Sequence, residues 1–260
     1  MTEKAFGLSN GGVRVGCAGW AIPTALAARF PGAGSHLARY ARVLSTVEIN
    51  SSFYRPHRPS TYARWAASVP EGFVFSVKVP KEITHSRRLV DPEEPLDRFL
   101  AEARSLGDKL GPLLVQLPPS LKMEPAVAGA FLTMLRDKHT GPVALEARHA
   151  SWFSPEVEAL LVAHRVARVG ADPAPVPGAD EPAGHPGLVY VRLHGSPRIY
   201  HSAYEPAFLD AMAQLLLRRS PSASVHCIFD NTASGAAPVD ALSMAARVNA
   251  PQPAKASPSC

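Results

Sequence analysis

The feature of this sequence that most limits its fold is a regular alternation of short β-rich runs with segments of helical periodicity. Eight runs rich in branched aliphatic residues begin at Val13, Thr46, Phe73, Pro112, Pro142, Arg165, Leu188 and Ser224. Between most of them apolar residues recur every three or four positions, which is typical of one face of a helix. Because each link between parallel strands needs a crossover, usually a helix, this alternation predicts parallel pairing.

Eight such units within 260 residues predict a single closed parallel (β/α)8 TIM-type barrel. No G-x-G-x-x-G follows any of the runs, which disfavours an open dinucleotide-binding sheet. The sixth crossover is irregular, because residues 172–187 are too rich in proline and glycine for a helix, and we expect an ordered loop there. We therefore expect a barrel domain over residues 13–249, with a flexible N-terminus at 1–12 and a flexible C-terminal tail at 250–260.

Polar side chains interrupt one face of most of these strands near their C-terminal ends. In the second run Val47 and Ile49 alternate with Glu48 and Asn50, so a period of two directs the polar pair inward. The same parity places further polar residues on the inner faces, namely Ser76, Lys78, Gln116, Glu146, Arg148, Arg192, His194, His226 and Asp230, and the sixth run ends at Asp172. Barrel enzymes assemble their sites at this end of the strands, so the pattern predicts one polar cavity there.

A purely structural network of ion pairs is the alternative explanation of this ring. Ionised groups in a protein interior are costly unless they are paired, and paired networks also line barrels. Its members would be Glu48, Lys78, Glu146, Arg148, Arg192 and Asp230. The recurrence of such residues on most of the strands favours a functional site over packing.

Nine blocks of the sequence also resemble the signature blocks of a known family. They are "GCAGW", "VEINSSFYR", "FSVKVP", "ITH", "LGPLLVQLPPSL", "LEARH", "SWF", "RLHGSPR" and "FDNTASGAA". By these blocks, which run from about Val13 to Leu242, the chain resembles the YecE-like family, or domain of unknown function 72. The resemblance implies a TIM-type barrel but no reaction, because the family has no settled activity. Ala147 and Ala150 stand where members often carry proline, and neither change touches an inward residue.

The ring predicts a hydrolase or lyase that acts on a phosphorylated or otherwise anionic substrate. Carboxylates can act as a general acid and base, and guanidinium forks match phosphate or carboxylate groups. The expected catalytic residues are Glu48, Lys78, Glu146, His194 and Asp230, with Glu48 or Glu146 as general base. The expected substrate-binding residues are Trp20, Asn50, Tyr54, Gln116, Arg148, Arg192, Arg198 and Asn231.

A divalent metal and a nucleic acid are the alternatives that the sequence leaves open. Metal ligands, if there are any, would be Glu48, Glu146, Asp172, His194 and Asp230, although Lys78, Arg148 and Arg192 would compete for the same carboxylates. Nucleic-acid binding, with or without endonuclease-like metal chemistry, is suggested by the pI near 9.3 and by arginines in the loops after the second and third strands. The oligomeric state is not predicted.

Composition and cysteine usage bear on location. A hydrophobic content of 46% with 19% charged residues is that of an ordinary globular protein. The three cysteines are odd in number and far apart, which suggests no disulfide framework. The first residues do not resemble a secretory signal, and no apolar run is long enough to cross a bilayer. We therefore expect a cytoplasmic protein with no membrane partner.

Overall fold

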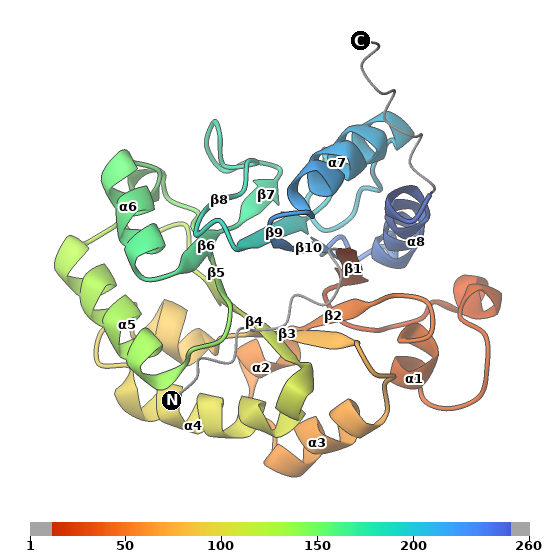
Figure 1. Cartoon of the computed structure of the whole chain (residues 1–260), viewed down its shortest axis with the longest axis horizontal. Coiled ribbons are helices and arrows are strands. Elements are labelled where there is room, and N and C mark those ends of the chain that lie inside the picture. The colour runs from red at the N-terminus through yellow and green to blue at the C-terminus, as the bar shows by residue number, and fades with distance from the viewer. Residues whose placement is uncertain (1–11, 251–260) are drawn as a thin grey trace, which may run out of the picture.

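The computed structural model describes residues 12–250, and each of the eight β-rich runs forms strand structure in it (Figure 1). The flexible ends expected at 1–12 and 250–260 lie outside the described residues, apart from positions 12 and 250. The strands are β1 (Val13–Cys17), β2 (Thr46–Ile49), β3 (Val74–Lys78), β4 (Leu110–Gln116), β5 (Val143–Glu146), β6 (Val166–Arg168), β7 (Gly170–Asp172), β8 (Ala183–Gly184), β9 (Leu188–Leu193) and β10 (Ser224–Phe229).

Helices follow most of these strands, as the periodicity predicts. They are η1 (Thr24–Arg29), α1 (His36–Tyr40), α2 (Ser51–Tyr54), α3 (Pro59–Ala67), η2 (Glu82–Ser86), α4 (Glu93–Ala103), η3 (Arg104–Lys109), α5 (Pro125–Lys138), η4 (Ala150–Trp152), α6 (Pro155–Ala163), α7 (Pro206–Arg219) and α8 (Ala237–Val248). Helices α3, α5, α6, α7 and α8 carry proline in their first turn, where its fixed φ suits the helix and no N–H bond is lost. Proline therefore marks the helix starts in this chain.

The expected single closed eight-stranded barrel is wrong. The strands of residues 12–250 pair in two sheets, one with the order β1-β10-β9-β7 and the other with the order β2-β3-β4-β5-β6-β8. Every pairing is parallel except that of β6 with β8. The protein is thus an α/β fold with two mainly parallel sheets. The two places where these sheets adjoin, which we call seams, explain why the strands do not close into one barrel.

At the first seam, side chains take the place of a backbone ladder between β1 and β2. The backbone N–H of Cys17 donates to the Tyr40 hydroxyl at 2.7 Å, and this hydroxyl donates to the backbone oxygen of Thr46 at 3.0 Å. The N–H of Val15 likewise donates to Ser45 Oγ at 3.3 Å. Only a single bridge, between Ala18 and Glu48, joins the two strands directly. A phenol inserted between two strands keeps them from joining as one sheet.

At the second seam the sixth β-rich run divides between the sheets. Its first part, β6, pairs with β5, and its second part, β7, pairs with β9. The segment that follows turns back, places β8 antiparallel to β6, and bonds the N–H of Ala171 to the oxygen of Ala179. Gly184 has a φ of 72°, and a Cβ there would lie 2.6 Å from the oxygen of Val166, so glycine is required for this close approach.

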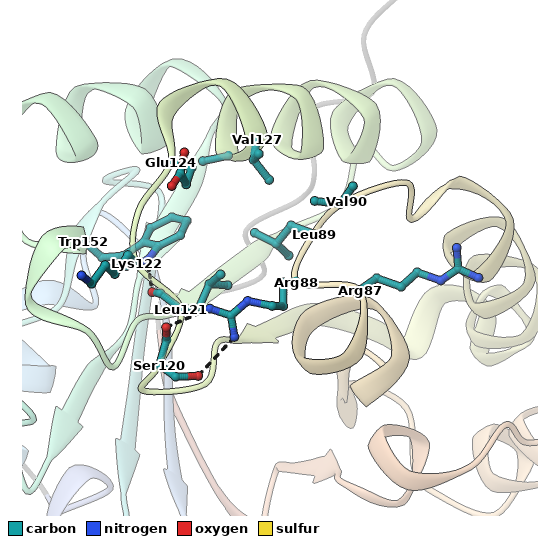
Figure 2. A pocket seen from close by; sticks show the side chains of 11 residues that line it. Arg87, Arg88, Leu89, Val90, Ser120, Leu121, Lys122, Glu124, Val127 and Trp152 are labelled. Carbon is teal, nitrogen blue, oxygen red and sulfur yellow. Dashed lines mark hydrogen bonds between the residues drawn. The ribbon is translucent and has the colours of Figure 1, made fainter.

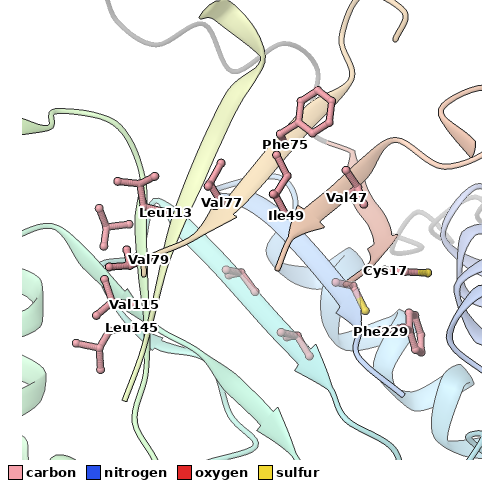
Figure 3. Close-up of a cluster of buried hydrophobic side chains, with 14 of the residues drawn as sticks. Cys17, Val47, Ile49, Phe75, Val77, Val79, Leu113, Val115, Leu145 and Phe229 are labelled. Carbon is pink, nitrogen blue, oxygen red and sulfur yellow. The ribbon is translucent and has the colours of Figure 1, made fainter. Parts of the chain in front are cut away.

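The helix-facing sides of the strands form the larger hydrophobic core. Strand residues that parity directs toward the helices are buried together in it, as Figure 3 shows for Val47, Ile49, Val77, Val115 and Leu145. Helix residues such as Leu96, Leu100 and Leu135 complete this layer. The predicted strand parity is therefore confirmed on the outer face.

The opposite sides of both sheets meet in a smaller apolar layer. It consists of Leu114, Ala144, Ala167, Val169, Leu188, Tyr190 and Ile228, with Ala18 packed against it. Strands β4, β5 and β6 of one sheet and β9 and β10 of the other contribute these residues, so the inner faces of the two sheets pack on one another. Polar residues follow this layer toward the C-terminal ends of the strands, and they form the candidate site.

Candidate functional site

Arg192 on β9 is the centre of a buried polar cluster. Its side chain is 0% exposed, and it grips Glu48 of β2 with two parallel hydrogen bonds, Nε to Oε2 at 3.0 Å and Nη2 to Oε1 at 2.7 Å. Bidentate pairs of this kind are the strongest guanidinium–carboxylate contacts. Tyr190, two residues earlier on the same face, donates its hydroxyl to Glu48 Oε2 at 2.8 Å. Glu48 is therefore fully engaged by donors from the other sheet.

The same guanidinium also binds two further carboxylates. Nη1 donates to Glu146 Oε2 at 2.6 Å, and Nη2 donates to Asp230 Oδ2 at 3.0 Å. Glu146 ends β5 and Asp230 follows β10, so one arginine joins carboxylates from three strands and both sheets. Burial alone would lower the pKa of Arg192, but the three carboxylates raise it well above its usual value. The central guanidinium therefore stays charged.

His194 lies between two of these carboxylates. Its Nδ1 is 3.0 Å from Asp230 Oδ2, and its Nε2 is 3.1 Å from Glu146 Oε1. A neutral imidazole has only one N–H, so only the protonated ring donates to both oxygens. Burial acts to lower the pKa of His194, but Glu146 and Asp230 outweigh it and raise the pKa. The two carboxylates therefore favour the imidazolium form of His194.

Two side chains besides Arg192 and His194 donate hydrogen bonds to Glu146. Gln116 Nε2 donates to its Oε2 at 3.0 Å, and Arg148 Nε donates to its Oε1 at 2.9 Å. Although burial would raise the pKa of Glu146, Arg192, His194 and Arg148 hold it well below the usual range. A carboxylate so thoroughly hydrogen-bonded is a weak base.

Arg148 extends this group toward solvent. Its side chain is 24% exposed, and its Nη1 lies 3.4 Å from the hydroxyl of Tyr200, an exposed residue in the loop after β9. Arg148 Nη2 also lies 3.3 Å from His194 Nε2, so both donors converge on Glu146 Oε1. We refer to Arg192, Glu48, Glu146, Asp230, His194, Gln116, Arg148 and Tyr190 together as the Arg192 cluster.

Lys78, the last residue of β3, stands beside the Arg192 cluster without an ion pair. It is 6% exposed, and its Nζ lies 4.3 Å from the centroid of the Phe53 ring. Among residues 12–250 no carboxylate oxygen comes within 4.0 Å of this amine. Burial, followed by the charge of Arg192, lowers the pKa of Lys78 to about 8 against the opposing pull of the cluster carboxylates. This amine therefore differs from every other cation of the site.

The structure thus brings together most of the residues that parity selects. Glu48, Gln116, Glu146, Arg148, Arg192, His194 and Asp230 are joined by hydrogen bonds, and Lys78 is beside them. Asn50 is at the edge, with its Nδ2 3.5 Å from Asp230 Oδ1. His226 lies deeper, stacked on Tyr190, and burial lowers its pKa to about 3.

Five other candidates make their contacts elsewhere. Trp20 packs edge-to-face on Trp65, and Tyr54 is 77% exposed beside Phe53. Asp172 accepts from the Tyr204 hydroxyl at 2.8 Å, which turns this proposed metal ligand away from the cluster. Two more belong to the loops after β9 and β10: Arg198 is exposed with its backbone N–H on Ser202 Oγ, and Asn231 donates to Asp240 and to the backbone of Ser202.

Sequence reasoning did not select Tyr190. Its position two residues before Arg192 places it on the inner face, so parity contains the signal. A tyrosine within an apolar run is, however, also an ordinary core residue, and Tyr190 does pack in the inner apolar layer. Only the partner of its hydroxyl identifies it as a member of the site.

Two described cavities lie apart from the Arg192 cluster. The larger, of about 440 Å³, has apolar walls that include Leu89, Val127 and Trp152, with Arg88 tied to Ser120 at its rim (Figure 2). The smaller, of about 260 Å³, is lined by residues of α2, η2 and α4. Neither has a cluster residue in its wall. The expected cavity lined by the inward polar residues therefore stays a prediction.

The candidate metal ligands do not form a metal site. Over residues 12–250 no group of three or more histidine, cysteine, aspartate or glutamate side chains has an arrangement suited to a metal ion. The oxygens of Glu48, Glu146 and Asp230 already accept hydrogen bonds from Arg192, whose charge would repel a cation. The residues present do not fit a divalent metal.

The fold and the cluster define an α/β protein of two mainly parallel sheets with a buried arginine–carboxylate site at the strand ends. The chain belongs to the family described as protein of unknown function DUF72, whose model matches residues 14–259. This membership agrees with the resemblance in the sequence blocks.

Individual relatives give the same result. The UPF0759 protein YunF from Bacillus subtilis (strain 168) is 27% identical over 149 residues, which are 55% of this chain and 53% of that protein, so the match spans about half the length of the relative. A DUF72 family protein from Enterococcus faecalis V583 has a solved structure with a TM-score of 0.78 at 24% identity, covering 93% of this chain and 97% of that one. Another, from Thermotoga maritima MSB8, has a TM-score of 0.73 at 24% identity, covering 89% and 97%.

These likenesses establish the family and the fold, and they name no activity. Within the described part of the chain, no helix combines the length and apolar character needed to cross a bilayer.

Proposed function

We propose that this protein is a lyase or hydrolase that acts on a small anionic substrate by acid–base chemistry at the Arg192 cluster. One observation carries the proposal. The three carboxylates of the cluster are all held by Arg192, whereas Lys78 beside them has no carboxylate within 4.0 Å in the described residues. The groups left to meet a ligand are therefore cations and proton donors.

Arg148 would hold the anionic group of the substrate. It retains 24% exposure, and the edge of its guanidinium toward Tyr200 is bonded only loosely, at 3.4 Å. Guanidinium donors match phosphate or carboxylate oxygens, and a partly dehydrated position strengthens that attraction. The Tyr200 hydroxyl would supply a further donor at the same edge.

His194 and Lys78 would handle protons. Asp230 and Glu146 favour the imidazolium form of His194, and a substrate oxygen that displaces Glu146 Oε1 from the Nε2–H group would receive a proton from it. Lys78, with a pKa of about 8, is a usable base near neutral pH. Glu48 is buried and fully hydrogen-bonded, so in this proposal it positions Arg192 and does not itself transfer protons.

The test is equilibrium binding of inorganic phosphate, glycerol phosphate and acetate to wild type and to Arg148→Met. Loss of one charged hydrogen-bond donor costs about 1.5–3 kcal/mol, so affinity should fall roughly 10- to 100-fold. The matched control is Arg64→Met, which removes an exposed arginine on α3, outside the cluster, and should leave affinity unchanged.

Equal effects of the two variants would contradict the proposal. Tight binding of a duplex oligonucleotide that weakens steeply with salt, with no small-anion binding, would instead support the nucleic-acid alternative.

A further inference from the structure

Lys78 is held at a fixed place by the strand end and by its neighbours. It is the last residue of β3, where it pairs with Leu114 of β4, and its backbone oxygen accepts from Ser52 Oγ at 2.7 Å. Its Nζ lies over the face of the Phe53 ring, 4.3 Å from the centroid. The residue as a whole is 6% exposed. Lys78 is therefore held in one place, with a small part of its surface still exposed.

A structural role does not account for this lysine. Burying a charged amine without a counter-charge is costly, and methionine would fill the same space against Phe53 without that cost. The cluster carboxylates that could pair with Lys78 are directed to Arg192 instead. Desolvation and a neighbouring cation, here Arg192, are the conditions that activate a lysine as a nucleophile.

The neutral amine is well populated at this position. With a pKa of about 8, about a tenth of the amine is neutral at pH 7, whereas the ordinary value of 10.5 would leave about one part in three thousand. Only the neutral form has the lone pair that attacks carbon.

We propose that Lys78 forms a Schiff base with the carbonyl group of an anionic aldehyde or ketone. This inference rests on the proposed function and names the substrate class of the same site. Arg148 and Tyr200 would bind the carboxylate or phosphate of that substrate, and its carbonyl carbon would then lie next to Nζ. His194 would lie near the carbonyl oxygen.

The step is balanced without an oxidant or reductant. The lone pair of Nζ forms a C–N bond, the carbonyl π electrons move to oxygen, and His194 supplies a proton to that oxygen. Nitrogen loses one proton to solvent, and the oxygen takes a second proton from solvent. Water then leaves with the C–O bonding pair as the nitrogen lone pair forms the C=N bond. The product is an iminium, which can accept the electron pair of an adjacent C–C bond as that bond breaks. An iminium at Lys78 would therefore favour the lyase form of the proposed function.

The experiment is reductive trapping on the full chain with glyoxylate, an anionic aldehyde, and cyanoborohydride, followed by intact-mass and peptide mapping. We expect one adduct per chain at Lys78, formed at least ten times faster than at any other lysine, with a rate that rises through about pH 8. Lys78→Arg and Lys78→Met should lose this adduct. Lys81→Arg, a change at an exposed neighbouring lysine, should retain it.

The outcomes separate this inference from the proposed function. Labelling spread over exposed lysines, or unchanged in Lys78→Arg, would overturn the Schiff base. If phosphate binding still depends on Arg148 in that case, the proposed function stands without it, and loss of both results would reject both. Equal trapping of propionaldehyde, a neutral aldehyde, at Lys78 would show that the substrate is not selected for negative charge and would overturn the anionic class.

Discussion

Two networks of arginines and carboxylates in this protein use the same chemistry in opposite surroundings. On the surface, Arg98 contacts Glu82 at 2.8 Å and Glu94 at 2.7 Å, and its side chain is 47% exposed. In the interior, Arg192 makes contacts of similar length with no exposure at all. Bond lengths alone do not tell the two networks apart.

The difference lies in what happens when a partner is removed. An exposed carboxylate that loses its arginine is hydrated, so surface pairs contribute only about 0.2–1 kcal/mol. A buried carboxylate that loses its arginine keeps its charge without water, and breaking such a pair costs about 3–5 kcal/mol. We therefore expect that the folded protein requires every member of the Arg192 cluster, whereas the surface network can be removed at little cost in stability.

The largest expected effect is that of Arg192→Met. The change leaves Glu48, Glu146 and Asp230 without their shared cation, so the melting temperature should fall by at least roughly 10 °C, or the protein should fail to fold. Arg192→Lys restores one charge but not the bidentate geometry, and it should melt between wild type and Arg192→Met. Thermal and urea unfolding measure both. An Arg192→Met protein that melts within about 2 °C of wild type would show that the cluster contributes no more to stability than the surface network does.

A smaller effect of opposite sign is expected for Lys78→Met. A lysine whose pKa is lowered to about 8 binds its proton less tightly in the folded protein than in the unfolded chain. Its contribution to the free energy of unfolding therefore decreases as pH falls from about 10.5 to about 8 and stays low below that range. The variant removes this loss, so at pH 7 it should be more stable than wild type by up to about 3.5 kcal/mol, which is about 1.4 kcal/mol for each of the roughly 2.5 pKa units between 10.5 and about 8.

The pH dependence is the measurement that sharpens this prediction. The gap between Lys78→Met and wild type in urea unfolding should be largest at pH 7 and should close toward pH 10.5. A variant that is less stable than wild type at pH 7 would mean that Lys78 has a stabilising ion pair in solution. Lys81→Met, at an exposed site, serves as control and should show no such pH-dependent gap.

The smallest effect is expected for Arg98→Ala. The variant breaks contacts with Glu82 and Glu94, both of which are well exposed, so the free energy of unfolding should fall by no more than about 1 kcal/mol. Raising the salt concentration should reduce even this difference, because screening weakens exposed pairs. A loss as large as that of Arg192→Met would remove the distinction between the two networks.

Much of the site was predictable from strand periodicity. Alternation places Glu48, Glu146, Arg192 and His194 on one face of their strands, and all four meet in the cluster. The particular pairings were not predictable, because the choice of Arg192 as the hub depends on how far each strand extends. Sequence periodicity likewise does not distinguish Lys78, which has no ion pair within residues 12–250, from Arg148, which has one.

The closed barrel was predicted wrongly for reasons that lie outside the strands. The Tyr40 hydroxyl sits between β1 and β2, yet Tyr40 belongs to α1 and its sequence position indicates only a core residue. The division of the sixth run depends on Gly184 and the fold-back of the segment around it. Hydrogen bonds from side chains to backbone at such seams follow no repeat that a pattern search could detect.

The contact between Glu48 and Arg192 has a consequence for how the chain acquires its native state. These residues are 144 positions apart, and Glu146 is 46 positions before Arg192. A ribosome releases both glutamates long before the arginine emerges, so the nascent sheet that begins with β2 holds carboxylates that must stay hydrated or protonated. Water can leave the space between the two sheets only once β9 has been synthesised. Formation of the site and docking of the β1-β10-β9-β7 sheet are then one event.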